Sequence, residues 1–156
     1  MLIDNNARYS INDLMPLIRE CINSGKRVNM RVTGVSMYPL LYNRRDTVVL
    51  ERADSVKKYD IVLHERQDGK YILHRIIKKK GDVLTIAGDF EIQKEYPVST
   101  SQVIARVVGF VRKGKYHDVN EPFFKAYAVI WVAIFPFRLT AVRVLRFLRR
   151  FFRVKK

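Results

Sequence analysis

The sequence predicts a mainly β fold, in which an antiparallel, partly barrel-like domain is flanked by helices at both ends. Between residues 27 and 112, short segments rich in valine and isoleucine alternate with turn-prone pieces, and no helical pattern separates them. Outside this region, apolar residues recur at helical spacing instead. A chain of 156 residues is long enough for one domain with a substantial core.

We divide the chain into three parts: an N-terminal helix packed on the core (1–26), the β domain (27–115), and an apolar and basic tail (116–156). Ser10 fits the N-cap position of the first helix, and Gly25 fits its end. One apolar face is formed by Ile11, Leu14, Met15, Ile18, Cys21 and Ile22. Because Cys21 is the single cysteine, the chain has no internal disulfide framework and no cysteine-based zinc site.

Six strands are expected in the β domain, at about 27–35, 46–53, 60–66, 70–78, 82–88 and 103–111. The turn-prone piece Gln67-Asp68-Gly69 lies between the third and fourth of them. This spacing predicts a hairpin.

The tail combines an apolar run with a basic helix. Residues 126–137 read AYAVIWVAIFPF, which is too short for a comfortable membrane span of about 20 residues and fits an interfacial or re-entrant segment. In the following helix, one side would carry Arg143, Arg146, Arg149, Arg150 and Arg153, and the other Leu145, Phe147, Leu148, Phe151 and Phe152. This pattern is typical of a helix lying in a membrane interface; the alternative is a helix packed on the β domain.

Positive charge is concentrated in the same tail. The formal net charge is +15, and residues 121–156 hold 9 basic residues against 1 acidic residue. Such a field attracts nucleic acid or an anionic membrane, although a soluble protein with a solvated basic surface also fits. The first ten residues, MLIDNNARYS, show no signal-peptide pattern.

Ser36 stands in the segment GVSMYPLL, and a serine nucleophile needs a base within hydrogen-bond reach. The candidates are His64, His74 and His117. Alternation along the strand around His74 does not decide which face is buried, and a histidine on a strand is more often structural. The residues alone therefore leave open whether Ser36 and His74 act together.

Four segments, GVSMYPLL, DTVVLERADSVKKYDIVLHE, ILHRII and AGD, resemble in order and spacing the type I signal peptidases, which are membrane-associated serine proteases. The resemblance covers about residues 30–112. Histidine at position 74, before Arg75, resembles the Ser-His branch of the family and differs from the related self-cleaving repressors, which use lysine. Arg45, Tyr59 and Phe90 depart from the usual pattern, as expected of a divergent member.

The resemblance implies that Ser36 is the nucleophile and His74 the base. It implies Asp89 as the orienting acid, with Glu95 as the alternative. Gly34, Val35 and Met37 would line the oxyanion and substrate-binding site, with a side-chain donor such as Thr33, because Gly34 lacks a hydroxyl. Family substrates are extended peptides with small residues at the first and third positions before the cut. No metal or organic cofactor is implied.

We therefore predict a serine endopeptidase that cleaves signal or leader peptides at or near a membrane. Its partners would be a peptide or protein precursor and an anionic membrane surface bound through residues 123–156, with no nucleic acid expected. Because the family's N-terminal membrane anchor is not recognised here, membrane association would be peripheral or monotopic through the C-terminal segment. The alternative is a non-catalytic basic β domain that binds membrane or nucleic acid.

Overall fold

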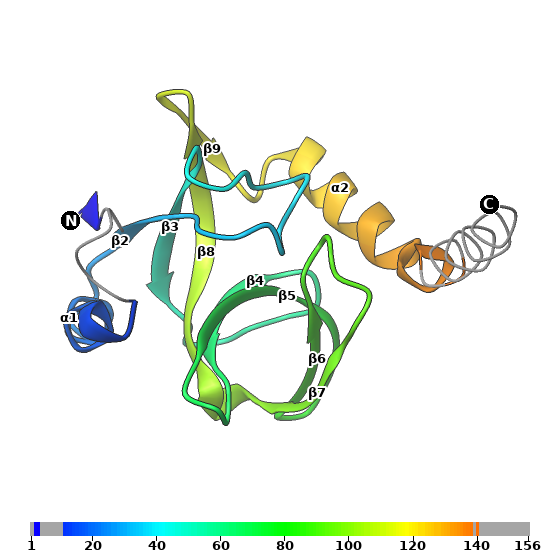
Figure 1. The fold of residues 1–156 in the computed structure, drawn as a ribbon, viewed down its shortest axis with the longest axis horizontal. Helices are drawn as coiled ribbons and strands as arrows, with labels where there is room; N and C mark the ends of the chain where they lie inside the picture. The colour runs from blue at the N-terminus through cyan, green and yellow to red at the C-terminus, as the bar shows by residue number, and fades with distance from the viewer. Residues whose placement is uncertain (1, 4–10, 139, 141–156) are drawn as a thin grey trace, which may run out of the picture.

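The computed structural model describes residues 2–3, 11–138 and 140, and it consists of a curved β-sheet with a helix at each end (Figure 1). The helices are α1 (Ile11–Asn23) and α2 (Pro122–Ala133), with a short 3-10 helix, η1 (Thr100–Gln102). The strands are β1 (Leu2–Ile3), β2 (Val28–Arg31), β3 (Thr47–Arg52), β4 (Ile61–Glu65), β5 (Tyr71–Lys80), β6 (Val83–Ala87), β7 (Glu95–Ser99), β8 (Val103–Arg112) and β9 (Lys115–Asp118).

The strands of the described part form one sheet in the order β1-β2-β3-β8-β4-β5-β6-β7, with β9 paired to β8. All pairs are antiparallel except β1 with β2, which is parallel. The mainly β class is confirmed, as are all six expected strands and the β4–β5 hairpin. The sheet curves strongly around β4 to β7 but stays open (Figure 1).

Helix α1 packs on the sheet through the face that the sequence predicted. Met15, Ile18 and Ile22 are buried in the main core. The helix ends where Gly25 adopts a φ of +77°, a conformation that glycine reaches without strain. There the Lys26 N–H donates to the Cys21 carbonyl over 2.9 Å. The predicted N-cap, Ser10, lies outside the described residues.

Two apolar clusters lie on opposite faces of the central strands, and this arrangement positions the site. Along β4, Leu63 belongs to the cluster that contains α1, whereas its neighbour Val62 belongs to the cluster among β4 to β7. Side chains alternate along a strand, and Val62 pairs with His74 while His64 pairs with Ile72. Both histidines therefore face the β4–β7 side of the sheet.

Helix α2 extends away from the sheet after β9 (Figure 1). Ala128 is buried against the domain, whereas Phe123 and Ile130 are exposed. None of the described helices is both long and apolar enough to cross a membrane. The predicted amphipathic basic helix falls on residues 139 and 141–156, which lie outside the described part of the chain.

Candidate active site

Ser36 lies in the loop between β2 and β3, and apolar neighbours fix this loop on the core. Met37 and Leu41 are buried, and the Leu41 N–H donates to the Met37 carbonyl over 2.9 Å. Ser36 itself is only partly buried. The loop therefore presents the hydroxyl-bearing residue at its edge while its apolar side chains anchor it.

Asp46 fixes the other end of the same loop. Its buried carboxylate accepts hydrogen bonds from the Tyr42 backbone N–H at 3.0 Å and from Arg112 Nη2 at 3.0 Å. Burial acts to raise the pKa of Asp46, but hydrogen bonds from Arg45 and Arg112 outweigh it and lower the pKa below its ordinary value. Asp46 is therefore ionised and holds the loop in place.

The Ser36 loop docks on the segment that follows β6. The Ser36 carbonyl accepts a hydrogen bond from the Phe90 N–H over 2.7 Å. A Cβ atom placed on Gly88 would lie only 2.6 Å from the same carbonyl oxygen. The rings of Tyr38 and Phe90 pack edge to face with centroids 5.4 Å apart. Position 88 therefore requires glycine for this contact.

Strand β5 brings His74 to the other side of Gly88. Arg75 pairs with Ala87, so the antiparallel register places His74 beside Gly88. Gly88 is therefore a neighbour of Ser36 through the Ser36 carbonyl and a neighbour of His74 through the strand register. Within the described part of the chain, neither ring nitrogen of His74 has a hydrogen-bond partner, so the Ser36 hydroxyl is not bonded to it in this arrangement.

His74 is fully buried and lies between two carboxylates. Its Nδ1 is 2.9 Å from Glu95 Oε1, and its Nε2 is 3.3 Å from Glu91 Oε2, although neither contact has hydrogen-bond geometry. Burial lowers the pKa of His74 below 6.5, against the opposing effect of the two carboxylates. The ring is therefore neutral at pH 7, as a general base must be.

Glu95 connects His74 to two further side chains. Arg66 binds its carboxylate with two N–H groups, one of them over 2.7 Å, and His64 Nε2 lies 3.3 Å from Glu95 Oε2. Burial acts to raise the pKa of Glu95, but the Arg66 hydrogen bonds and the nearby histidines lower it. Glu95 is therefore an ionised carboxylate in a fixed position next to the His74 ring.

Asp89 has a different partner. Its carboxylate forms a two-point ion pair with Arg75, at 2.8 Å (Nε to Oδ1) and 2.7 Å (Nη2 to Oδ2), and both side chains are buried. Tyr127 of α2 donates to Oδ2 over 3.3 Å, and Trp131 Nε1 donates to the Asp89 carbonyl over 2.9 Å. Asp89 thus links the segment after β6 to α2, and its carboxylate is bound by Arg75.

The residues predicted to form the oxyanion and substrate-binding site differ in burial and in hydrogen bonding. The Gly34 N–H donates to Asn43 Oδ1 over 3.1 Å, so this N–H already has a hydrogen-bond acceptor. Val35 is exposed, whereas Met37 is buried. Ser36 lines a cavity of about 170 Å³ together with Thr33, Met37, Leu63, Tyr71 and Leu73, among others. Thr33 in this lining carries the hydroxyl that Gly34 lacks, whereas His74 and Glu95 do not line this cavity.

His74 and two nearby carboxylates are close enough to one another to hold a metal ion. Within the described residues, one ligand atom each of His74, Glu91 and Glu95 lies within 4.8 Å of the other two. Glu95, however, already accepts two hydrogen bonds from Arg66, so a metal ion would compete with a guanidinium there.

Sequence reasoning gave no role to Arg66 or Glu91, and it considered His64 only as one of three candidate bases. The distances between residues 64, 74 and 95 depend on three pairings: β4 with β5, β5 with β6, and β6 with β7. The one signal available in the sequence was the position of His64 and His74 on the two strands of the predicted hairpin.

Comparison with known proteins gives one family. The family model described as Peptidase S24-like matches residues 3–108, which include Ser36, His74, Asp89 and Glu95. A search of curated proteins found no significant match. The match confirms a peptidase-family domain over this region and supports a peptidase, while the assignment to the signal peptidases stays a prediction. Because the match covers more than half of the 156 residues, the chain belongs to the Peptidase S24-like family.

Proposed function

We propose that the protein is a serine endopeptidase that cleaves signal or leader peptides at a membrane surface. Ser36 is the nucleophile, His74 the general base and Glu95 the orienting acid. The observation that carries this proposal is the 2.9 Å distance between Glu95 Oε1 and His74 Nδ1. Gly88 is a neighbour of this histidine and also of Ser36.

In the proposed reaction, neutral His74 accepts the hydroxyl proton at Nε2 while Ser36 Oγ attacks the scissile carbonyl carbon. Glu95 Oε1, 2.9 Å from Nδ1, accepts the Nδ1–H after a small rotation of the ring and stabilises the imidazolium. The proton then passes to the leaving amine, and an ester between Ser36 and the substrate remains. Water, deprotonated by His74, hydrolyses the ester, and the Ser36 hydroxyl is restored. The Ser36 backbone N–H is the proposed oxyanion donor.

Glu91 must move before this chemistry can begin. Its carboxylate lies 3.3 Å from His74 Nε2, the atom that has to reach the Ser36 hydroxyl. The Glu91 side chain is 38% exposed, so it can turn toward solvent when substrate enters. Catalytic hydrogen bonds often tighten only in the substrate complex.

Membrane association is supported by the surface of α2 and the residues after it. Phe123, Ile130 and Phe137 are 72%, 59% and 71% exposed, and they are spaced by seven residues. A spacing of seven returns to nearly the same side of a helix. An exposed apolar row of this kind fits the interfacial region of a membrane.

The test is cleavage of a fluorogenic leader peptide with small residues at the first and third positions before the cut. Ser36→Ala and His74→Ala should each lower turnover by about three to six orders of magnitude, with unchanged circular dichroism spectra. Activity retained in either variant contradicts the proposal. A wild-type protein that cleaves nothing but binds vesicles or DNA in a salt-dependent manner would support the non-catalytic alternative.

A further inference from the structure

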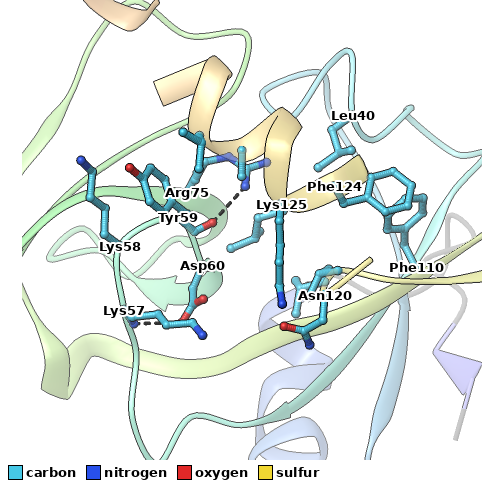
Figure 2. Close-up of a pocket in the computed structure, with 15 residues that line it drawn as sticks. Leu40, Lys57, Lys58, Tyr59, Asp60, Arg75, Phe110, Asn120, Phe124 and Lys125 are labelled. Carbon is cyan, nitrogen blue, oxygen red and sulfur yellow. Dashed lines mark hydrogen bonds between the residues drawn. The ribbon is translucent and has the colours of Figure 1, made fainter. Parts of the chain in front are cut away.

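A second cavity, of about 450 Å³, lies between α2 and the sheet (Figure 2). Its volume is within the range of small-molecule sites, about 300–1,000 Å³. Ser36, His74 and Glu95 do not line it. The cavity is therefore a separate feature of the fold, whose function the proposed peptidase chemistry does not explain.

One end of this cavity is apolar. Figure 2 shows the rings of Phe110 and Phe124 together next to Leu40, with the two ring centroids 5.0 Å apart in an edge-to-face arrangement. Ala128 and Val129 of α2 also line the cavity. Such walls favour a hydrocarbon chain over a sugar or a free ion, because they offer no hydrogen-bond partner.

Other parts of the lining carry positively charged side chains. Lys57 and Lys58 lie at the other end of the cavity, and Lys125 extends across it from α2 (Figure 2). None of these three ammonium groups forms an ion pair with a carboxylate in the described part of the chain, and Asp60 is the one acidic residue of the lining. Asp60 Oδ2 accepts the Lys57 backbone N–H over 2.9 Å.

Arg75 also lines the cavity but is not available to an anion. Its Nε and Nη2 bind the Asp89 carboxylate, and its Nη1 donates to the Tyr59 carbonyl over 2.9 Å. With Arg75 compensated, the lining keeps three cationic side chains against one carboxylate. This excess attracts an anionic group, while the apolar end accommodates a chain.

We propose that this cavity binds the acyl chain of an anionic membrane lipid, with its phosphate on the positively charged side of the lining that Lys57, Lys58 and Lys125 provide. Charge complementarity and the apolar end define the chemistry of the ligand. Its source follows from α2, which lines the cavity with Val129 and exposes Phe123 and Ile130 toward solvent. The same helix would thus lie on the membrane and receive a chain from it. This inference does not require peptidase activity.

The test uses the full chain and dodecyl phosphate below its micelle-forming concentration, measured by isothermal titration calorimetry. One molecule should bind per protein. Inorganic phosphate and dodecyl maltoside should each bind at least about tenfold more weakly, because each provides only half of the interaction. Vesicles containing phosphatidylglycerol should compete with dodecyl phosphate, and phosphatidylcholine vesicles should not.

The triple variant K57Q/K58Q/K125Q should weaken dodecyl phosphate binding about tenfold, as expected for three partly exposed charge contacts. The matched control K26Q/K113Q/K115Q removes three exposed lysines that do not line the cavity and should leave the affinity unchanged. Val129→Trp should fill the cavity from its half-exposed position and abolish binding, with an unchanged circular dichroism spectrum.

The proposal is overturned if the folded wild-type protein does not bind dodecyl phosphate, or if binding survives both the triple variant and Val129→Trp. Equal affinity for dodecyl maltoside would also overturn it, because the lysines would then contribute nothing to binding. Ser36→Ala should bind dodecyl phosphate like the wild type, so failure of the peptidase proposal and failure of this one are distinguishable.

Discussion

Glu95 Oε1 lies 2.9 Å from His74 Nδ1, and Arg66 holds the same carboxylate with two hydrogen bonds. In our proposal Glu95 therefore has the orienting role, whereas Asp89 forms an ion pair with Arg75. Glu95→Gln should lower kcat for leader-peptide cleavage by about 10²–10⁴-fold, because the amide favours the wrong imidazole tautomer. Steady-state kinetics measure the effect, and full activity of Glu95→Gln would disprove the assignment.

The pH dependence of cleavage should reflect the lowered pKa of His74. Burial is the largest cause of the shift, and the Glu91 and Glu95 carboxylates oppose it. A base with a lowered pKa stays neutral to lower pH, so the acidic limb of kcat/KM should lie below pH 6.5. Glu91→Gln removes one opposing carboxylate and should move this limb to still lower pH. A limb that moves upward in Glu91→Gln would contradict the geometry.

The same shift has a consequence for stability. A histidine whose folded-state pKa is below its unfolded-state value favours folding while it is neutral. The contribution from His74 should be fully present above pH 6.5 and lost as the pH falls below that value. Urea titrations of wild type and His74→Gln between pH 5 and 7.5 measure it: the wild type should lose more stability on acidification. Parallel losses in the two proteins would count against this interpretation.

The buried pair of Arg75 and Asp89 should matter mainly for stability. Asp89→Asn leaves the Arg75 charge without its partner in a site from which water is excluded, which costs about 3–5 kcal/mol. Chemical denaturation measures the loss. The exposed pair of Asp68 and Lys70 provides the control, because Asp68→Asn should cost less than about 1 kcal/mol. Similar losses of stability at the two sites would show that burial does not increase the contribution of the Arg75–Asp89 pair.

Gly88 tests the contact between the serine loop and the segment after β6. In Gly88→Ala, the new methyl would lie 2.6 Å from the Ser36 carbonyl oxygen, so the loop must move. A displacement near 1 Å lowers activity by about 100-fold. Gly81→Ala is the control: Gly81 has a φ of +57° and no atom within 4 Å of the added Cβ. It should lose about 1 kcal/mol of stability but keep its activity.

The exposed apolar row, which begins on α2 and continues past its end at Ala133 to Phe137, should govern vesicle binding. Replacing Phe123, Ile130 and Phe137 with serine removes apolar area from the membrane contact, so affinity for phosphatidylglycerol vesicles should fall at least about tenfold. Vesicle flotation measures this change. Tyr96 is 70% exposed on β7, and Tyr96→Ser should bind like the wild type. Unchanged flotation of the triple variant would place the membrane contact elsewhere.

Much of the fold could be predicted from local sequence, because the six main strands combine β-branched residues with turn-prone boundaries. Strand β7 could not, because its sequence EYPVS is short and contains Pro97, and proline is unfavourable inside a sheet. Strand β9 reads KYHD and carries no apolar pattern. Its pairing with β8 depends on the hairpin connection and not on apolar periodicity.

The site was predictable only in part, for a related reason. Successive residues His74, Arg75 and Ile76 on β5 are all buried, because both faces of the sheet are covered there. Alternation then cannot tell which side chain faces the nucleophile. The resemblance implied Ser36 and His74, but the proximity of Glu95 to His74 depends on the pairing of three strands, β5, β6 and β7.

The most direct test of the central claim is intact-protein mass spectrometry after reaction with an activated-ester acylating probe. The account predicts one acyl adduct, located on Ser36 by peptide mapping. The adduct should be absent in Ser36→Ala, and its formation in His74→Ala should be slowed by at least about 10²-fold. Acylation at another residue, or undiminished labelling of Ser36 in His74→Ala, would contradict the pairing of this serine with this histidine.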